Sequence, residues 1–404
     1  MGVYLTNARV VDATGVREAA SVLVESDRIV RIGASSDAMP EGAAVVDLAG
    51  RTLLPGLIDA HVHVTAFELP VPLKGEAVVA PEVKHHFVAA GLRTMLRMGV
   101  TTVRDVGAFG DDLLHARRAI ELGALAGPRI LACGRILSAT SPGGAHFAGM
   151  YREADGPDEM RKATREQIRR GADFIKLMTT GARSVVLEDP EPAQVTRAEV
   201  ATVVEEAHRM GFRVAAHCEG LDGTRLAIEE GVDTIEHGLE LHREPALLET
   251  LAKSGRILVP TLSCFFDLSE THACLWAPRL VELAKRQREE AHQTVEAARS
   301  AGVRMAMGYD SMPHGQSALE LVRLHGAGLT ALEAIASATA VAADACGLGD
   351  ELGTVEPGKR ADLLVVDGDP LADPRLLLDA ERIWLVVQSG RPVAGAALEP
   401  APPF

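Results

Sequence analysis

Leu54-Pro55-Gly56-Leu57-Ile58-Asp59-Ala60-His61-Val62-His63 is the stretch at which the pattern of this sequence changes, and it decides the fold. It supplies a turn and then a short apolar strand that ends in two histidines. From this point onward short apolar runs recur, and most are followed by a segment with the period of an amphipathic helix. Strands that alternate with helices in this way indicate βα units and a parallel sheet.

The repetition of these units predicts an α/β architecture for the central region. Eight apolar runs are expected to be strands: Gly56–His63, Val100–Val106, Arg129–Leu137, Asp173–Met178, Arg213–His217, Thr234–His237, Ile257–Leu262 and Arg304–Tyr309. Helical periodicity marks Pro81–Arg97, Glu159–Arg170, Arg197–Met210 and Arg279–Ser300. Eight units within about 250 residues are typical of a (β/α)8 TIM-like barrel, which we place at residues 56–345. An open doubly wound sheet is the alternative, and the lack of GxGxxG after an early strand disfavours it.

Both ends of the chain have a β character that the centre lacks. Strand-like runs occur near the start at Val3–Leu5, Ala8–Val11, Ser21–Glu25, Arg28–Ile32 and Ala44–Asp47, and near the end at Ala361–Val366, Arg382–Gln388 and Arg391–Val393. Residues 1–55 are too few for an independent large fold. We therefore expect residues 1–55 and 346–404 to form one small β-sandwich domain together.

Composition limits the classes of protein that this chain can represent. Hydrophobic residues make up 47% of its 404 residues, which is enough for a sizeable core, and the formal net charge of −15 disfavours a nucleic-acid partner. The five cysteines are odd in number and form no CxxC pair, so neither a disulfide framework nor a four-cysteine zinc site is expected. The N-terminus has no signal-peptide pattern, and no apolar stretch reaches membrane-spanning length. We expect a cytoplasmic enzyme without a membrane partner.

One lysine lies inside an expected strand, and several other polar side chains stand where expected strands end. Lys176 lies inside the apolar run Asp173–Met178, where a lysine is costly unless it is paired or chemically changed. His61 and His63 share one face of their strand, because successive side chains alternate between the two faces. The residues that end or follow later runs are His217, His237 and Asp310. Together these six residues can build a hydrolytic site that holds two metal ions.

Each of these residues also has a simpler interpretation. A histidine in an apolar run is often a hydrogen-bonded core residue, and Asp310 could be the N-cap of the next helix. The protonated ammonium of Lys176 would be repelled by two metal ions, whereas a neutral amine could bind one of them. A carboxylated lysine would be an anion able to bridge both ions, and the sequence alone does not show this modification.

Two long motifs resemble those of the metal-dependent amidohydrolase superfamily. They are the opening stretch 54–63 and Leu352-Gly353-Thr354-Val355-Glu356-Pro357-Gly358-Lys359-Arg360-Ala361-Asp362-Leu363. The segments Lys176–Gly181 and Ser141–His146 are similar to the branch of binuclear-zinc dipeptidases, which includes prolidase-like enzymes and amidohydrolases of N-acyl amino acids. Imidazolonepropionase is a nearby branch that is typically mononuclear, and Lys176 favours the binuclear branch.

The resemblance implies a ligand set and a mechanism. His61 and His63 would bind one divalent metal together with Lys176 and Asp310, and His217 and His237 would bind the other. A carbamate on Lys176 would bridge the two ions, for which zinc is expected. Asp310 would accept the proton of the attacking hydroxide and pass it to the leaving amine. His146 could donate a hydrogen bond to the developing oxyanion, although it could equally be a solvated loop histidine.

The resemblance also suggests residues that bind the substrate. Besides His146 they are Tyr151, Arg183, Glu219 and His314, with Phe67 at the same mouth. A guanidinium pairs well with a substrate carboxylate, whereas a solvated loop arginine is the simpler interpretation of Arg183. The sequence departs from the dipeptidases at two points. Cys218 and Glu219 follow His217, where a tyrosine is common, and Ala145 separates the glycine pair from His146.

The function predicted from these features is hydrolysis of a C–N amide bond in a dipeptide or an N-acyl amino acid. A cyclic-amide hydrolase and a deaminase are the alternatives within the same chemistry, but deaminases usually use one metal and lack the bridging lysine. A barrel that has lost catalysis and only binds a ligand is a further alternative, and the complete ligand set disfavours it. The expected partners are a small molecule or dipeptide and further copies of the chain in a homo-oligomer.

Overall fold

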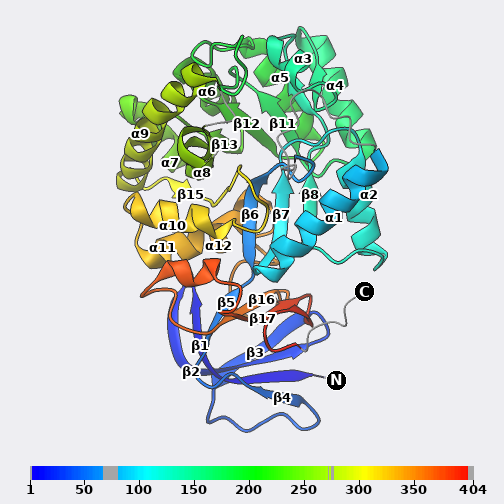
Figure 1. Ribbon diagram of the computed structural model, residues 1–404, viewed down its shortest axis with the longest axis vertical. Coiled ribbons are helices and arrows are strands. Elements are labelled where there is room, and N and C mark those ends of the chain that lie inside the picture. The colour runs from blue at the N-terminus through cyan, green and yellow to red at the C-terminus, as the bar shows by residue number, and fades with distance from the viewer. Residues whose placement is uncertain (1, 67–80, 272, 274–276, 399–404) are drawn as a thin grey trace.

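Three sheets and a surrounding layer of helices make up the described part of the chain. The computed structural model describes residues 2–66, 81–271, 273 and 277–398. One sheet has eight strands from both ends of the chain, and the other two have seven and three strands from its centre. Figure 1 shows the helix-covered central part above the eight-stranded sheet.

The eight-stranded sheet pairs the first strands of the chain with the last. Its strands are β1 (Val3–Asp12), β2 (Gly15–Glu25), β3 (Arg28–Ala34), β4 (Ala44–Asp47), β5 (Thr52–Pro55), β16 (Leu363–Val366), β17 (Ile383–Gln388) and β18 (Arg391–Ala394). The order is β18-β17-β16-β5-β1-β2-β3, and β4 also pairs with β1. Leu54 and Pro55, which we expected in a turn, end a strand, because antiparallel β16 offers partners for their backbone groups.

The two central sheets are parallel throughout. The three-stranded sheet contains β6 (Leu57–Val62), β7 (Val100–Asp105) and β8 (Arg129–Ala132). The seven-stranded sheet, in spatial order, contains β10 (Tyr151–Glu153), β9 (Ile136–Ser138), β11 (Ile175–Met178), β12 (Val214–Cys218), β13 (Thr234–His237), β14 (Ile257–Val259) and β15 (Arg304–Met305). The prediction of a mixed α/β fold with parallel sheets is therefore confirmed.

Some expected strands are shorter or divided. The run Arg129–Leu137 forms β8 and β9, because the chain turns at Gly134, whose φ is 71°. The run Ile257–Leu262 is a strand only as far as Val259, and helix α8 begins at Leu262. In the described part of the chain no strand ladder joins the two parallel sheets into one closed barrel.

Single backbone hydrogen bonds nevertheless connect the end of the chain's last central run to β6. Ala60 N–H donates to the Met307 carbonyl at 2.9 Å, and Asp310 N–H donates to the His61 carbonyl at 2.9 Å. The expected strand Arg304–Tyr309 is regular only in its first two residues, because its later residues form such bonds singly. These bonds bring Asp310 beside the two histidines of β6.

Helices cover the parallel sheets. They are α1 (Pro81–Arg97), α2 (Asp112–Glu121), α3 (Pro142–His146), α4 (Pro157–Arg170), α5 (Arg197–Arg209), α6 (Leu221–Glu230), α7 (Pro245–Ser254), α8 (Leu262–Phe266), α9 (Pro278–Ser300), α10 (Ala318–Gly326), α11 (Ala331–Ser337) and α12 (Ala340–Ala345). Local sequence sets several of their ends: Thr196 with Glu199 and Thr330 with Glu333 form capping boxes that start α5 and α11.

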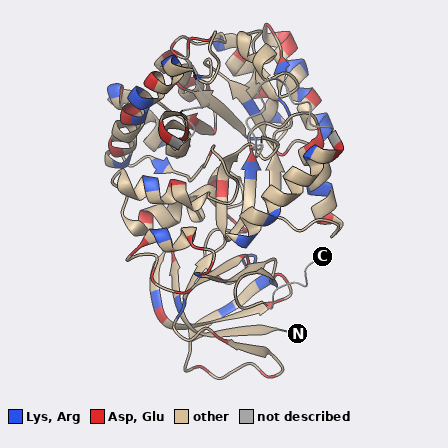
Figure 2. Cartoon of the chain, in the orientation of Figure 1, with Lys and Arg blue, Asp and Glu red and all other residues tan. Residues whose placement is uncertain are grey.

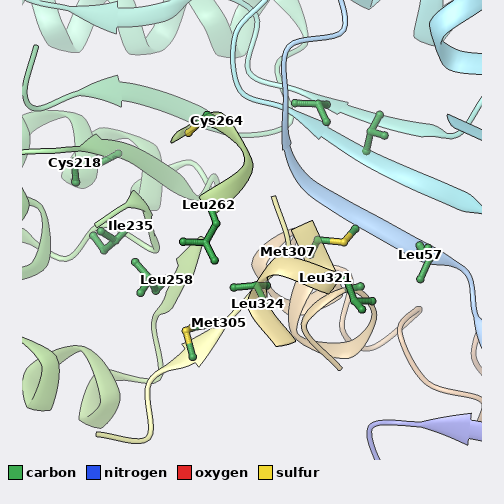
Figure 3. Close-up of a cluster of buried hydrophobic side chains, with 14 of the residues drawn as sticks. Leu57, Cys218, Ile235, Leu258, Leu262, Cys264, Met305, Met307, Leu321 and Leu324 are labelled. Carbon is green, nitrogen blue, oxygen red and sulfur yellow. The ribbon is translucent and has the colours of Figure 1, made fainter. Parts of the chain in front are cut away.

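The main core lies between the parallel strands and these helices. Figure 3 shows part of this cluster, in which Met307 lies beside Leu321, and whose members include Leu57, Met305 and Leu324. Figure 2 shows acidic and basic residues interspersed along the outer helices rather than gathered in one basic surface. No helix among the described residues is long and apolar enough to span a membrane.

Candidate metal centre

The two histidines at the end of β6 converge on Asp310. The Nε2 atoms of His61 and His63 each lie 3.7 Å from Asp310 Oδ1. These three side chains offer ligand atoms that all lie within 4.8 Å of one another. Two imidazole rings and one carboxylate at this spacing are suitable ligands for a divalent metal ion.

The backbone around Asp310 is built for this close approach. Asp310 has a left-handed φ of 39°, which turns the chain at the end of the run. Gly308 lies so close to β6 that a Cβ atom there would be 2.6 Å from the Cβ of His61. A side chain at position 308 would therefore push the Asp310 segment away from the histidines.

His217 and His237 lie beside this cluster at the ends of adjacent strands. Their ring centroids are 4.5 Å apart, and the rings of His61 and His237 are 5.0 Å apart. His237 Nδ1 lies 2.6 Å from the Thr261 hydroxyl and 4.0 Å from Asp310 Oδ2. Burial lowers the pKa of His61 and His237 well below the usual range, so both rings are neutral and keep a lone pair for a metal.

Lys176 lies in the wall of the same cavity and is 2% exposed. Burial lowers the pKa of its amine. Among the residues that the structure describes, no carboxylate lies within ion-pair distance of it. A lysine in these surroundings is closer to its neutral, nucleophilic form than a surface lysine is, and only the neutral form can react with CO2 or bind a metal.

A layer of buried charged residues beneath the ligands was not foreseen from the sequence. Glu236 is fully buried, and its Oε2 atom lies 2.7 Å from His61 Nδ1. Its Oε1 atom accepts a hydrogen bond of 2.7 Å from Arg104 Nη2. The sequence pattern that could have identified Arg104 and Glu236 is the one that identified Lys176, since each of them is a charged residue inside an apolar strand.

Two buried aspartates hold the loops that carry the ligands. Asp59 accepts hydrogen bonds from the backbone N–H groups of His61 and Tyr309, and Asp105 accepts from those of Val64 and Gly107. Burial raises the pKa of Asp59 to about 6 and that of Asp105 to about 7. The charge of these two carboxyl groups, and with it the hydrogen bonding that holds the loops, therefore depends on pH.

All six predicted metal ligands line one cavity of about 310 Å³. The remaining wall has a polar and an apolar part. The polar part includes Arg183, Glu219 and Cys264, and the apolar part includes Phe109, Ile136, Phe147, Met150, Tyr151 and Met178. A cavity of this size, with a few polar groups set in an apolar wall, is typical of a small-molecule site.

Arg183 and Glu219 form a buried ion pair in the polar wall. Arg183 Nη1 lies 2.7 Å from Glu219 Oε1, and Arg183 Nη2 donates to Cys264 Sγ at 2.8 Å. Burial opposes ionisation of Glu219, but the Arg183 guanidinium holds the pKa of Glu219 below its usual range. The pair therefore presents little net charge to the cavity. Cys264 is a wall residue that the sequence analysis missed, since its five-residue helix α8 has no recognisable motif.

Three of the residues expected at the mouth lie elsewhere or outside the described chain. His146 is exposed at the end of α3 and does not line the cavity, so the structure does not bring it to the reacting atoms. His314 does not line the cavity either, and its Nε2 atom lies 2.7 Å from the Ala66 carbonyl. Phe67 lies outside the described residues. Tyr151, by contrast, lines the cavity and is 9% exposed.

Comparisons with known proteins agree with this geometry. A model of the amidohydrolase family matches residues 52–393. The ochratoxinase of Aspergillus niger is 30% identical over 423 residues, which cover 96% of this chain and 85% of the relative. The imidazolonepropionase of Sphingopyxis alaskensis is 27% identical over 405 residues, covering 90% of this chain and 92% of that protein.

Solved structures are similar over almost the whole chain. A Xaa-Pro dipeptidase with methionine bound in its active site matches with a TM-score of 0.88 and 29% identity, covering 98% of this chain and 100% of that one. The structure of A. niger ochratoxinase matches with a TM-score of 0.87 and 26% identity, covering 98% and 96%.

Proposed function

The chain belongs to the amidohydrolase family, and on this premise we propose that it is a binuclear metal-dependent hydrolase of a C–N amide bond in a dipeptide or an N-acyl amino acid. The observation that carries the proposal is the convergence of four imidazoles, a buried lysine and Asp310 on one cavity. Hydrolases among its relatives, which include a Xaa-Pro dipeptidase and an ochratoxinase, support the reaction type.

The residues that face the cavity have separable roles in this proposal. His61, His63 and Asp310 would hold one divalent ion, His217 and His237 would hold the other, and Lys176, carboxylated, would be a ligand shared by both. Zinc suits these nitrogen and oxygen donors, and two such ions supply the Lewis acidity for water activation and carbonyl polarisation. Asp310 takes the proton of the attacking water and delivers it to the leaving amine.

The substrate that fits the rest of the cavity has a free carboxylate and an apolar group. Of the five N–H donors on the Arg183 guanidinium, the side-chain bonds to Glu219 and Cys264 use two, so donors remain for a carboxylate. The apolar wall around Phe147 and Met150 would cover a hydrophobic part of the substrate. Glu219 already pairs with Arg183, which weakens the repulsion that its charge would otherwise exert on the carboxylate.

The decisive experiment compares kcat/KM for a dipeptide and its C-terminal amide, using purified zinc-loaded protein and the Arg183→Ala variant. The wild type should prefer the free carboxylate, because the amide leaves guanidinium donors unpaired, and Arg183→Ala should lose that preference. Equal rates in the wild type would exclude carboxylate recognition. A cyclic amide would then be the better candidate, which the similarity to imidazolonepropionase favours.

The proposal extends to the architecture and the setting of the enzyme. We propose that residues 56–345 form a (β/α)8 barrel and that residues 1–55 and 346–404 form a β-sandwich domain. The single backbone bonds between β6 and the Asp310 segment, and between Asp173 and Ala132, support closure of the parallel strands on both sides.

A homo-oligomer acting on a small molecule in the cytoplasm completes the proposal. Sedimentation analysis of the purified protein would test the oligomeric state.

A further inference from the structure

Glu236 occupies an unusual position directly beneath the ligand cluster. It precedes His237 on β13, and its carboxylate is fully buried in the interior rather than at the cavity surface. Each oxygen of this carboxylate has partners: Oε2 lies 2.7 Å from His61 Nδ1, and Oε1 accepts from Arg104 at 2.7 Å and from the Thr234 hydroxyl at 2.5 Å. A buried carboxylate with this many donors has a defined position.

Arg104 holds Glu236 in place by reaching across three strands. From β7 its Nε atom donates to the Ala60 carbonyl of β6 at 2.6 Å, and its Nη1 atom donates to Thr234 of β13 at 2.9 Å. The guanidinium also lies over the ring of Phe174, 5.3 Å from its centroid. The network therefore connects the two parallel sheets at the level of the metal ligands.

The partners of His61 determine which of its nitrogens carries the hydrogen. An ionised carboxylate paired with a guanidinium can only accept, so His61 Nδ1 must be the donor to Glu236. The Nε2 atom then keeps its lone pair, and it is this atom that faces Asp310 at 3.7 Å. The hydrogen-bond partners of His63 and His237 at Nδ1 are neutral, the Gly107 carbonyl and the Thr261 hydroxyl. Of these three rings, His61 alone has a charged group at hydrogen-bond distance from Nδ1.

We propose that Glu236, held by Arg104, is a positioning residue that fixes the Nδ1–H tautomer and the ring orientation of His61 and thereby strengthens metal binding at Nε2. The metal-binding part of this inference rests on the function proposed above. The tautomer itself is a property of the metal-free protein. A purely structural ion pair would leave the metal affinity of a folded variant unchanged.

The first experiment measures zinc affinity by competition with a chelator in the wild type, Glu236→Gln and Glu206→Gln. Glu236→Gln should bind zinc about 10- to 100-fold more weakly, which is the usual cost of losing such a partner. Glu206 is the matched control, because it is a buried carboxylate on α5 that pairs with three arginines away from the cavity. Its variant should bind zinc as the wild type does. A folded Glu236→Gln protein with wild-type zinc affinity would overturn the proposal.

A second measurement keeps the proposal testable if Glu236→Gln does not fold. Nitrogen-15 NMR of the metal-free, histidine-labelled wild type, with the His61 signals assigned by a His61→Gln variant, reports the tautomer directly. The expected result is a hydrogen on Nδ1 and a bare Nε2. A hydrogen on Nε2 would overturn the positioning role. Failure of the wild type to bind any divalent metal would instead refute the proposed function and leave the tautomer result standing.

Discussion

The cavity has two halves that are built by different parts of the fold. One half, here called the metal-facing half, carries the six proposed metal ligands. They lie on β6 and the residue after it, on β11, β12 and β13, and on the Asp310 segment, and backbone hydrogen bonds tie each of these segments to a neighbouring strand. Much of the substrate-facing half comes from the segment between α3 and β10, from α8 and from the loop after β11, which belong to connections between strands. The difference shows that the fold constrains the residues of the metal-facing half more firmly than the residues that would bind the substrate. Loops can change without disturbing the strands.

The strongest test of the metal-facing half is Lys176→Ala. It should remove the group that we propose bridges the two metal ions, so the protein should lose bound metal and its activity should fall to background, a loss of about 10⁶-fold or more. Elemental analysis and amide hydrolysis would be measured together. A short carboxylic acid added to the variant should partly restore both, whereas a variant that retains two metals and normal turnover would show that Lys176 is not a ligand.

Asp310→Asn should give the next largest effect. The amide can still coordinate through its oxygen but cannot accept a proton, so kcat should fall between about 10²- and 10⁴-fold. Circular dichroism should show an unchanged fold. Near-normal kcat with both metals bound would assign the proton transfer to another group.

The stability of the metal-facing half should depend on pH through Asp105. Its folded pKa of about 7 lies above the unfolded value of 3.8, so the folded state binds more protons in this interval. The contribution is fully present below pH 4 and is lost as the pH rises toward 7, an effect of about 4 kcal/mol. Urea unfolding of the metal-free protein at several pH values should show this decline, and Asp105→Asn should reduce it. An identical pH dependence in the two proteins would contradict the assignment.

The substrate-facing half should respond more weakly and only to some substrates. Phe147→Ala removes a ring from the apolar wall, so kcat/KM should fall about tenfold for a substrate with a large apolar group. A small substrate such as an N-acetyl amino acid is the control and should be hydrolysed at the wild-type rate. Equal losses for both substrates would mean that the ring supports the metal-facing half instead.

His146→Ala should have the smallest effect of all. The side chain is exposed and does not line the cavity, so kcat should change by less than about twofold, as for most surface substitutions. A loss of 100-fold or more would show that α3 moves His146 onto the bound substrate, and the two halves would then share catalysis.

Whether the position of a residue could be predicted from the sequence depends on which half of the cavity it belongs to. Strand ends were recognisable because an apolar run has a local pattern, and parallel strands of one sheet bring their ends together. His146 and His314 were misplaced because loop positions depend on packing that no local pattern encodes. Strand β5 was missed because its partner β16 lies at the other end of the chain.

The sequence by itself determined the alternation of strands and helices, the parallel sheets and the six residues that converge on one cavity, because strand period and chain direction are local properties. Only the tertiary structure decided that Arg183 pairs with Glu219 and that Glu236 holds His61 from another sheet. These contacts join residues far apart in the chain. Their formation depends on which buried charges meet when the sheets pack, because a buried charge is stable only beside a partner that the completed core supplies.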